Sequence, residues 1–406
     1  FGSSCKTNVD AKGWHVRHSP NLLHMVLFTH RAECTWDSEL GVRTVNQYRI
    51  SNEEAGRGTY SPVQWAIAAE GTFAVKVFHR GSLSKQVAFF DENGPTTESM
   101  QERVRRELEI LAMLGHANIV RLVEVVDDPN VAAMFAIFEG LHGGQLLRFA
   151  QKKVAYCAHS DADVVQRYWG AEASSGGSVP ELSNLDASEV LVFQEMVSRH
   201  LFLGVLEGCA YLHANNVIHK DVKPDNITLT VPVPTADPRF VQILSLQEWP
   251  TSAARRSLAG VPTGIEALLA RHQVVAKLVD FNSSLHATDP TCTIWDAQGT
   301  TLFTPPECFN EASKTGVLGK PRDAWSCGVV LFCLFFGRCP YWAEDALWLQ
   351  VKIGFEEFSY PKQVLSPASE DLLLQLLKRE PGERLSLAAA LQHPWFGQRD
   401  GNATGA

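Results

Sequence analysis

The sequence predicts an α+β fold with two parts, a small antiparallel sheet and a larger, mainly helical region. Three short runs rich in β-branched and aromatic residues, at 48–53, 63–68 and 72–78, are separated by glycine-containing turns, which is typical of an antiparallel meander. Beyond Glu139 most apolar residues recur at helical spacing. The 406 residues, of which 45% are apolar, are enough for roughly two to three compact parts.

One helix and two further strands complete the first part. Residues 101–114 carry apolar side chains at helical spacing with charged residues between them. Residues 119–126 and 133–138 have the composition of strands. We therefore expect a small lobe at 47–139, preceded by an extension, 1–46, that has no clear periodicity.

The second part is predicted at 140–398 and consists mostly of helices. Its longest helix is predicted over 186–213, beginning with a capping box formed by Asp186 and Glu189. Further strands are expected at 227–230 and 274–279, and further helices at 265–270, 323–336, 366–379 and 386–393. Two inserts, one rich in Ser, Gly, Asp and Ala and one rich in proline, are expected near 151–185 and 231–272, and 399–406 would form a tail.

Charge and cysteine content restrict the class of protein. With 36 basic and 45 acidic residues the formal net charge is −9, which disfavours a nucleic-acid-binding domain. The longest apolar stretch, 327–337, is too short to span a bilayer, so no membrane span is expected. Nine cysteines without a CxxC pair favour reduced thiols and a cytoplasmic location. The chain begins without Met, so any N-terminal targeting signal is unreadable.

Two features of the first part are compatible with phosphate binding. Gly56 and Gly58 lie in a glycine cluster between two predicted strands, where backbone N–H groups can approach phosphate oxygens; a plain hairpin turn is the alternative. Lys76 lies in the middle of an apolar strand, where a charge is costly unless it is paired. Glu107 on the following helix is the candidate partner, and a lysine extending from an edge strand to solvent is the alternative.

The segment 219–226 carries the most specific chemical pattern. Its order of residue types places Asp221, Lys223 and Asn226 in one loop between a helix and a short strand. Such a loop suits phosphoryl transfer, because the carboxylate can accept a hydroxyl proton, the lysine can offset charge on the moving group and the amide can hold a metal ion.

Later residues extend this pattern. Asp280 follows a predicted strand and supplies a second hard oxygen ligand suited to Mg²⁺. Glu307 and Arg384 are expected to form a buried ion pair with a structural role. Over roughly 48–396 these pieces occur in the order of a protein kinase domain.

Within that superfamily the sequence resembles the calcium/calmodulin-dependent protein kinase kinases. The matching segments are VNQY at 45–48, VEVVDDPN at 123–130, GKPRDAW at 319–325, FGRCPY at 336–341 and HPW at 393–395. The resemblance implies a two-lobed fold and a serine/threonine kinase in signal transduction that uses ATP and Mg²⁺. Its protein substrate would be another kinase, phosphorylated on an activation-loop threonine.

The resemblance also implies roles for individual residues. Phe138 would be the gatekeeper beside the adenine. The implied catalytic residues are Asp221, Lys223, Lys76 and Glu107. The implied nucleotide-binding residues are Ala55, Gly56, Gly58, Val63, Ala74, Lys76, Glu139, Leu141 and Asp280, and the implied metal ligands are Asn226 and Asp280.

Several positions depart from the family pattern. The departures are Asn282 for Gly, Lys220 for Arg, Ser61 for Gly, Ala55 for a larger aliphatic residue and Thr228 for an apolar one. Lys220 cannot grip a phosphate in bidentate fashion, and Asp296 could supply a fixed negative charge near Thr300 instead. No basic amphipathic helix follows Trp395, so we expect no calmodulin-binding segment in this chain.

These departures motivate an alternative from another class, a pseudokinase that serves as a scaffold or binding module. Asn282, Thr228 and Ser61 favour it, and the two inserts would be its docking surfaces. The reacting groups themselves are all present, which favours the enzyme. Separately, Arg255 and Arg256 before Ser257 resemble the target of a basophilic kinase, with a solvated loop as the alternative.

Overall fold

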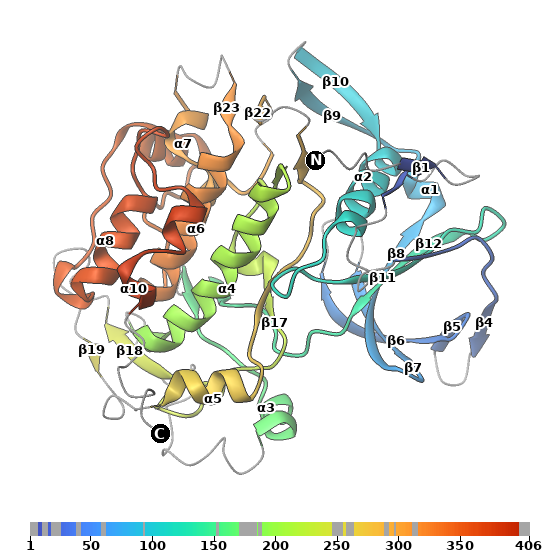
Figure 1. Cartoon of the computed structure of the whole chain (residues 1–406), viewed down its shortest axis with the longest axis horizontal. Helices are drawn as coiled ribbons and strands as arrows, with labels where there is room; N and C mark the ends of the chain where they lie inside the picture. The colour runs from blue at the N-terminus through green and yellow to red at the C-terminus, as the bar shows by residue number, and fades with distance from the viewer. Residues whose placement is uncertain are drawn as a thin grey trace, which may run out of the picture. The chain divides into compact units, whose positions relative to one another are not determined.

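The chain divides into two compact units, which Figure 1 shows in one view. The first unit comprises 1–141 and 279–286, and the second comprises 142–278 and 287–406. The computed structural model describes residues 7–9, 15–17, 26–37, 42–57, 62–91, 94–151, 154–169, 185, 189–245, 255–256, 264–287, 292–295, 298–310 and 316–397. The expected α+β class is confirmed, since a sheet dominates the first unit and helices the second.

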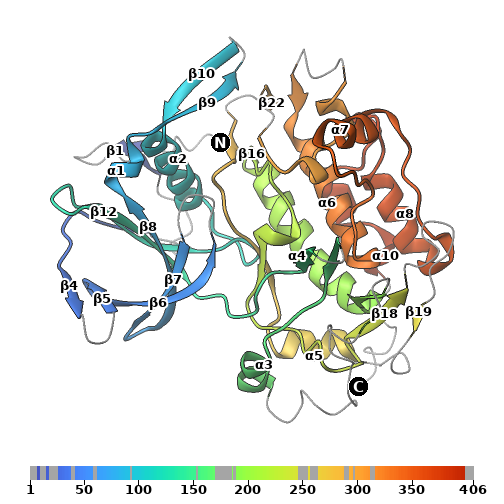
Figure 2. The same cartoon turned by 180° about the vertical axis from the view of Figure 1, so that it is seen from behind.

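An eight-stranded sheet is the centre of the described part of the first unit, with strand order β3-β11-β12-β8-β7-β6-β5-β4. Its bounds are β3 (Leu27–Thr29), β4 (Cys34–Asp37), β5 (Val42–Val45), β6 (Tyr48–Arg57), β7 (Pro62–Ala68), β8 (Gly71–His79), β11 (Leu122–Val126) and β12 (Ala133–Glu139). Strands β6, β7 and β8 pair antiparallel, which confirms the predicted meander. Figure 2 shows β6, β7 and β8 from the side opposite to that of Figure 1.

Strands from 26–45 join this sheet, although the sequence there shows no period. Strand β3 pairs in parallel with β11, and β4 and β5 continue the antiparallel edge beyond β6. Each is only three or four residues long, which is too short for alternation to be recognised. The hydroxyl groups of Thr29 and Tyr48 both bond to the buried carboxylate of Glu124, which fastens this segment to the sheet.

The predicted helix of the first unit is confirmed as α2 (Met100–Met113). A capping box between Ser99 and Glu102 fixes its first turn. The helix buries Val104, Leu108 and Leu111, the apolar positions expected from their spacing. The connection between β8 and α2 contains α1 (Arg80–Leu83) and the hairpin β9 (Gln86–Asp91) and β10 (Gly94–Ser99).

The predicted start of the long helix in the second unit is wrong. Residues Glu189–Phe193 form strand β15, and helix α4 (Glu195–Ala214) begins six residues later than Glu189. Strand β15 pairs antiparallel with β18 (Val241–Ser245), and almost all of its side chains are buried. This pairing overrides the helical pattern, so Glu189 forms no capping box; Asp186 lies outside the described residues.

The two regions expected as irregular inserts contain ordered elements that pack together. The first holds β14 (Ala155–Cys157) and α3 (Ala162–Trp169), which the composition of this segment did not predict. Trp169 stacks on His272 with ring centroids 4.0 Å apart and donates its indole N–H to the carbonyl of Pro232 at 2.7 Å. A single buried tryptophan thus links both inserted regions.

The remaining elements of the second unit include a buried helix, α6 (Gly319–Phe336), which begins four residues before the predicted start. They include β16 (Val217–Ile218), β17 (Ile227–Leu229), β20 (Ala276–Leu278), α5 (Ile265–Arg271), α8 (Pro367–Leu376), α9 (Leu387–Ala390) and α10 (Pro394–Gly397). Helix α7 (Ala346–Phe355) is not anticipated by the sequence. The predicted pair of Glu307 and Arg384 is confirmed, buried and bidentate, at 2.7 and 3.0 Å.

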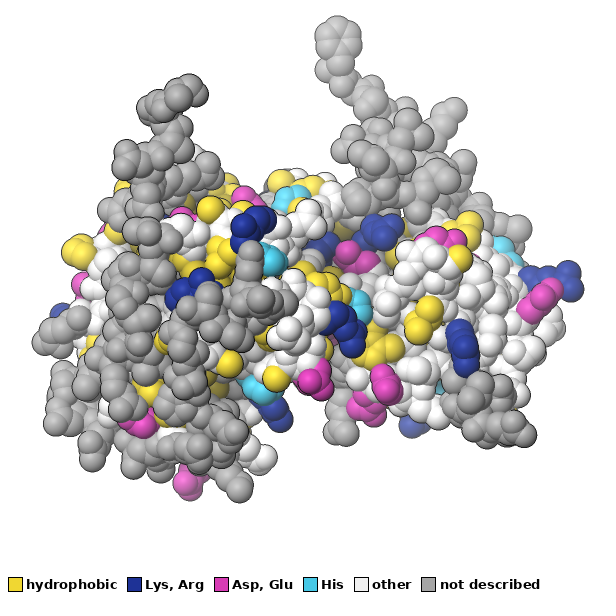
Figure 3. All heavy atoms as spheres, turned by 90° about the horizontal axis from the view of Figure 1, so that it is seen from below, with side chains coloured by type: hydrophobic (Ala, Val, Ile, Leu, Met, Phe, Trp, Pro, Cys, Tyr) yellow, Lys and Arg dark blue, Asp and Glu magenta, His cyan; other side chains and the backbone are white. Residues whose placement is uncertain are grey.

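The surface carries a mixture of charges. On the face shown in Figure 3, lysine and arginine side chains alternate with aspartate and glutamate among the coloured residues. Of the helices in the described ranges, none has the length and apolar character that crossing a bilayer requires.

Candidate active site

Lys76 in β8 forms a buried ion pair with Glu107 of α2. Its Nζ lies 2.8 Å from Glu107 Oε1 and 3.4 Å from Asp280 Oδ1, all within the first unit. The lysine side chain is 5% exposed, so the charge is compensated by carboxylates instead of water. The predicted pairing of Lys76 with Glu107 is therefore confirmed, and the edge-strand alternative is wrong.

The carboxylates keep Lys76 charged. Burial by itself would lower the pKa of Lys76, but the charges of Glu107 and Asp280 outweigh it and raise this pKa to about 12. Burial also raises the pKa of Glu107, and the lysine offsets that only in part. A permanently protonated ammonium group at Lys76 is suited to holding phosphate oxygens.

The other nucleotide-binding candidates of the first unit lie on its strands or just beyond them. Val63 on β7 is the cross-strand neighbour of Lys76, and Ala74 is the neighbour of Phe138 on β12. Glu139 ends β12 and accepts the backbone N–H of Arg121. Ala55 and Gly56 lie in β6, and Leu141 follows β12. Gly58 and Ser61 lie outside the described residues.

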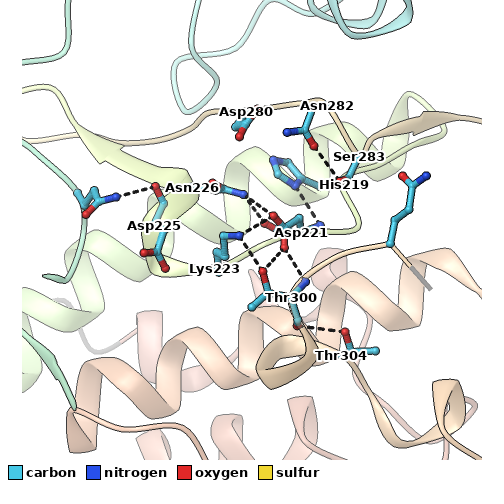
Figure 4. A network of polar contacts seen from close by, with 12 residues as sticks. His219, Asp221, Lys223, Asp225, Asn226, Asp280, Asn282, Ser283, Thr300 and Thr304 are labelled. Atoms are coloured by element: carbon cyan, nitrogen blue, oxygen red, sulfur yellow. Dashed lines mark hydrogen bonds and ion pairs between the residues drawn. The ribbon is translucent and has the colours of Figure 1, made fainter. Parts of the chain in front are cut away.

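Asp221 is the centre of a polar network in the second unit, which Figure 4 shows from close by. Its Oδ1 accepts the backbone N–H and the hydroxyl of Thr300, at 2.9 and 2.8 Å. Its Oδ2 accepts from Lys223 Nζ at 2.8 Å and from Asn226 Nδ2 at 2.9 Å. Lys223 Nζ also donates to the Thr300 hydroxyl at 2.7 Å. The structure thus brings the three predicted loop residues together around one carboxylate.

This network keeps Asp221 ionised. Burial alone would raise the pKa of Asp221, but Lys223, the Thr300 hydroxyl and His219 favour the charged form and hold the pKa below its usual value. Asp221 is therefore a carboxylate at neutral pH, which is the form that can accept a proton.

Asp323 at the start of α6 supports the loop from inside the second unit. Its fully buried carboxylate accepts the backbone N–H groups of His219 and Lys220, both at 2.9 Å, and the imidazole of His213 at 3.1 Å. Burial would raise the pKa of Asp323, yet the hydrogen bond and charge of His213, with His219, lower it overall. A buried anion with these donors fixes the backbone that leads to Asp221.

Thr300 belongs to this network, although sequence reasoning left it without a role. The signal for it was the preceding Gly299, whose φ is +117° and whose missing Cβ would lie 2.6 Å from the carbonyl oxygen of Lys220. Only glycine fits at this approach, because a side chain would collide with backbone atoms. The close approach brings Thr300 within hydrogen-bonding distance of Asp221.

The structure describes the local geometry at two of the departures, Asn282 and Lys220. Asn282 does not have a positive φ; the left-handed residue is Asp280, at φ 57°. The Asn282 side chain accepts a hydrogen bond from Ser283 at 2.8 Å. Lys220 adopts φ 65° and donates its backbone N–H to Asp323. Asp296 and Ser257 lie outside the described residues.

Most of the sequence matches one known protein family. The protein kinase domain family matches residues 50–232 and 265–396, which is most of the chain. The chain belongs to the protein kinase family. The unmatched stretch between these two ranges lies within the second predicted insert, and the enzyme class expected from 219–226 is confirmed.

Individual relatives agree with this assignment. The serine/threonine-protein kinases GRIK1 and GRIK2 of Arabidopsis thaliana are 27% and 26% identical, each over 90% of this chain and over 70% and 69% of their own lengths. The calcium/calmodulin-dependent protein kinase kinase of Caenorhabditis elegans is 26% identical over 88% of this chain and 53% of its own length. The resemblance found in the sequence is thereby confirmed.

Replacing the Thr300 hydroxyl tests the network around Asp221. We expect Thr300→Ala to reduce kcat about 10- to 100-fold, because Asp221 and Lys223 lose a shared hydrogen-bonding partner. Thr300→Ser keeps the hydroxyl and should stay within about threefold of the wild type. Steady-state kinetics of both variants checks this, and equal kcat values for the two variants would contradict the role of the hydroxyl.

The pH dependence of stability tests the contribution of Asp323. Asp323→Asn should lower the free energy of unfolding by about 1–3 kcal/mol at neutral pH, because buried donors lose their anionic acceptor. Since the folded-state pKa is below the ordinary 3.8, this contribution is complete above that value and is lost as pH falls through the folded pKa. The gap between the urea midpoints of variant and wild type should therefore narrow in acid. A gap that is independent of pH would contradict this.

Proposed function

We propose that this protein kinase transfers the γ-phosphoryl group of ATP to a serine or threonine hydroxyl of a protein. The observation that supports this most is the network in which Asp221 is held by Lys223, Asn226 and Thr300. A carboxylate, a lysine and an amide in one short loop are the groups that phosphoryl transfer requires of a protein.

On the nucleotide side, the proposal assigns phosphate binding to Lys76. Its ammonium group is charged, buried and oriented by Glu107, so little reorganisation is needed when a phosphate arrives. Ala55, Val63 and Ala74 would contact the base and sugar from the strands of the first unit, together with Glu139 and Leu141. The backbone N–H groups of Gly56 and Gly58 would approach the phosphate oxygens.

On the acceptor side, the proposal assigns the substrate hydroxyl to Asp221. Each oxygen of this carboxylate already accepts two hydrogen bonds, so an incoming hydroxyl must displace one donor. Lys223 is the donor with the most flexible side chain, and once displaced it can bond to the phosphoryl group. The hydroxyl oxygen then bonds to the γ-phosphorus, the bond to the ADP oxygen breaks, and the proton passes to Asp221.

The donor set also fits a magnesium ion brought in with ATP. Asn226 uses its amide N–H₂ for the backbone carbonyl and Oδ2 of Asp221, which leaves its Oδ1 as the atom suited to a cation. Asp280 would supply a carboxylate oxygen. No cluster of three or more His, Cys, Asp or Glu able to hold a metal occurs among the described residues. Mg²⁺ needs few protein ligands when phosphates complete its coordination, and it would neutralise charge on them.

The substrate is proposed to be the activation loop of another protein kinase. One relative is named as a protein kinase kinase, and two others as serine/threonine-protein kinases, and all three match about nine-tenths of this chain. Lys223, two residues after Asp221, is the feature of the chain that supports serine or threonine as the acceptor.

A scaffold with weak or no phosphoryl transfer is the second candidate. Of the three departures that motivated this alternative, Thr228 still supports it. This residue lies in β17 and is the cross-strand partner of Lys277. Asn282 supports it less than its sequence suggested, because its backbone does not adopt the positive φ that would favour glycine.

A kinetic comparison of two variants separates these functions. Asp221→Asn should reduce ADP release in the presence of an acceptor protein by about 1,000-fold or more, while ATP affinity stays within about threefold. Lys76→Met should weaken ATP binding, because the buried ammonium group is lost. Calorimetry for ATP binding and a coupled ADP assay measure the two effects. Equal turnover by the wild type and Asp221→Asn would support the scaffold.

A further inference from the structure

Helix α7 in the second unit exposes a continuous apolar strip. Leu347, Val351 and Phe355 recur every four residues and are 72%, 38% and 69% exposed. Residues at this spacing lie on one side of a helix. Leu349 and Ile353 on the opposite side are buried in the unit, so the strip is not required for holding α7 in place.

Two tryptophans widen this strip. Trp348 is 54% exposed and Trp342, just before the helix, is 45% exposed. Exposed apolar surface of this kind marks interaction sites, and tryptophan is one of the residues that most often carries binding energy at an interface. We call Trp342, Leu347, Trp348, Val351 and Phe355 the α7 strip.

The strip is held rigidly. Asp345 caps the helix by accepting the backbone N–H of Trp348 at 2.8 Å. At the other end the guanidinium group of Arg379 donates to the carbonyls of Ile353, Gly354 and Glu356. Both ends of α7 are therefore fixed, and binding to it costs little conformational entropy.

Acidic side chains border the strip at both ends. Glu344 and Asp345 precede the helix, Glu356 and Glu357 follow it, and all four are exposed. Glu357 is paired with Arg379 at 3.9 Å, so the negative charge of the border comes mainly from the other three. Lys352 on the helix donates its ammonium group to the carbonyl of Trp342 at 3.1 Å, which draws it along the apolar surface. The complementary ligand is an apolar surface flanked by lysine or arginine.

The position of α7 indicates what kind of protein carries that ligand. The helix contacts the 3₁₀ helices η5 (Thr301–Phe303) and η6 (Pro306–Cys308), and η5 directly follows Thr300, which bonds to Asp221. The helix that carries the strip is thus packed against the segment that follows Thr300, the partner of Asp221.

We propose that the α7 strip docks a basic amphipathic helix of the protein substrate. Leucine or aromatic side chains of that helix pack on Leu347, Trp348 and Phe355. Its basic flanks face the carboxylates of Glu344, Asp345 and Glu356. Docking tethers the substrate and raises the effective concentration of its acceptor residue. The inference rests on the proposed kinase function only for identifying the partner as a substrate.

A binding measurement tests the strip without catalysis. The probe is a fluorescein-labelled synthetic helix with leucines on one face and lysines at both ends, titrated with the full chain and followed by anisotropy. We expect Leu347→Glu/Phe355→Glu to weaken its binding at least about tenfold, since two exposed anchors are lost. Ile67→Glu, at a residue 62% exposed on β7, is the matched control and should bind like the wild type. Asp221→Asn should also bind like the wild type.

A kinetic measurement tests the role in substrate selection. A short threonine peptide is compared with the same peptide joined to the lysine-flanked helix by a flexible linker. The wild type should show a KM about tenfold lower for the joined peptide, and the double variant should lose this advantage. Both proteins should act equally on the short peptide. If neither peptide is phosphorylated while the probe still binds, the kinase proposal fails and the docking surface stands.

Three results would overturn the inference. Equal binding of the probe to the wild type and the double variant would exclude the α7 strip as the binding site of the probe. Equal binding of a probe with glutamates in place of the lysines would exclude the acidic border as a selector. A wild-type dimer in sedimentation, dissociated by Leu347→Glu/Phe355→Glu, would show that a second copy of the chain covers the strip.

Discussion

The proposed chemistry depends on the hydrogen bonds that the buried carboxylate of Asp323 accepts. It is completely shielded from solvent and accepts two consecutive backbone N–H groups of the loop that carries Asp221. A buried anion is unstable unless such donors surround it, so the loop and the start of α6 fix one another. Lys220 is held in a left-handed conformation by this arrangement, and Gly299 packs against its carbonyl. Gly299 in turn places Thr300 next to the loop, where the Thr300 hydroxyl bonds to Asp221 and Lys223.

Each unit contains a cluster of charged residues to which we assign a part in phosphoryl transfer. In the first, the positive charge of Lys76 is compensated by the carboxylates of Glu107 and Asp280. In the second, Asp221 is compensated by Lys223 and by the amide of Asn226. Most polar atoms of both sets are paired, which stabilises the buried charge, and the exception is Oε2 of Glu107, which is buried without a hydrogen-bond partner. In the proposed mechanism, substrate binding would exchange some of these internal hydrogen bonds for bonds to the substrate. Lys223, two residues after Asp221, is the donor proposed to make this exchange.

Much of this could be predicted from the sequence where function requires particular residue types at close spacing. The loop 219–226, the pair of Lys76 with Glu107 and the pair of Glu307 with Arg384 follow from residue chemistry, and the structure shows each of them. The strand at 189–193 could not be predicted, because its pairing partner, β18, lies fifty residues away in a proline-rich segment. Helix α7 was missed since its apolar residues lie on both faces, and the outward strip obscures the helical period. Thr300 was missed because its role depends on a contact that only the fold creates.

The most direct test of this account is a single-turnover measurement of phosphoryl transfer by Asp323→Asn. Asp323 contacts only the loop backbone and His213 among the hydrogen bonds described, so its loss should slow transfer from γ-labelled ATP about 10- to 100-fold. The dissociation constant for ATP should stay within about twofold, because Lys76 and its partners lie in the other unit. An unchanged transfer rate in a variant that is correctly folded would contradict the claim that this buried carboxylate sets the geometry of the loop. Absence of transfer by the wild type would contradict the proposed activity itself.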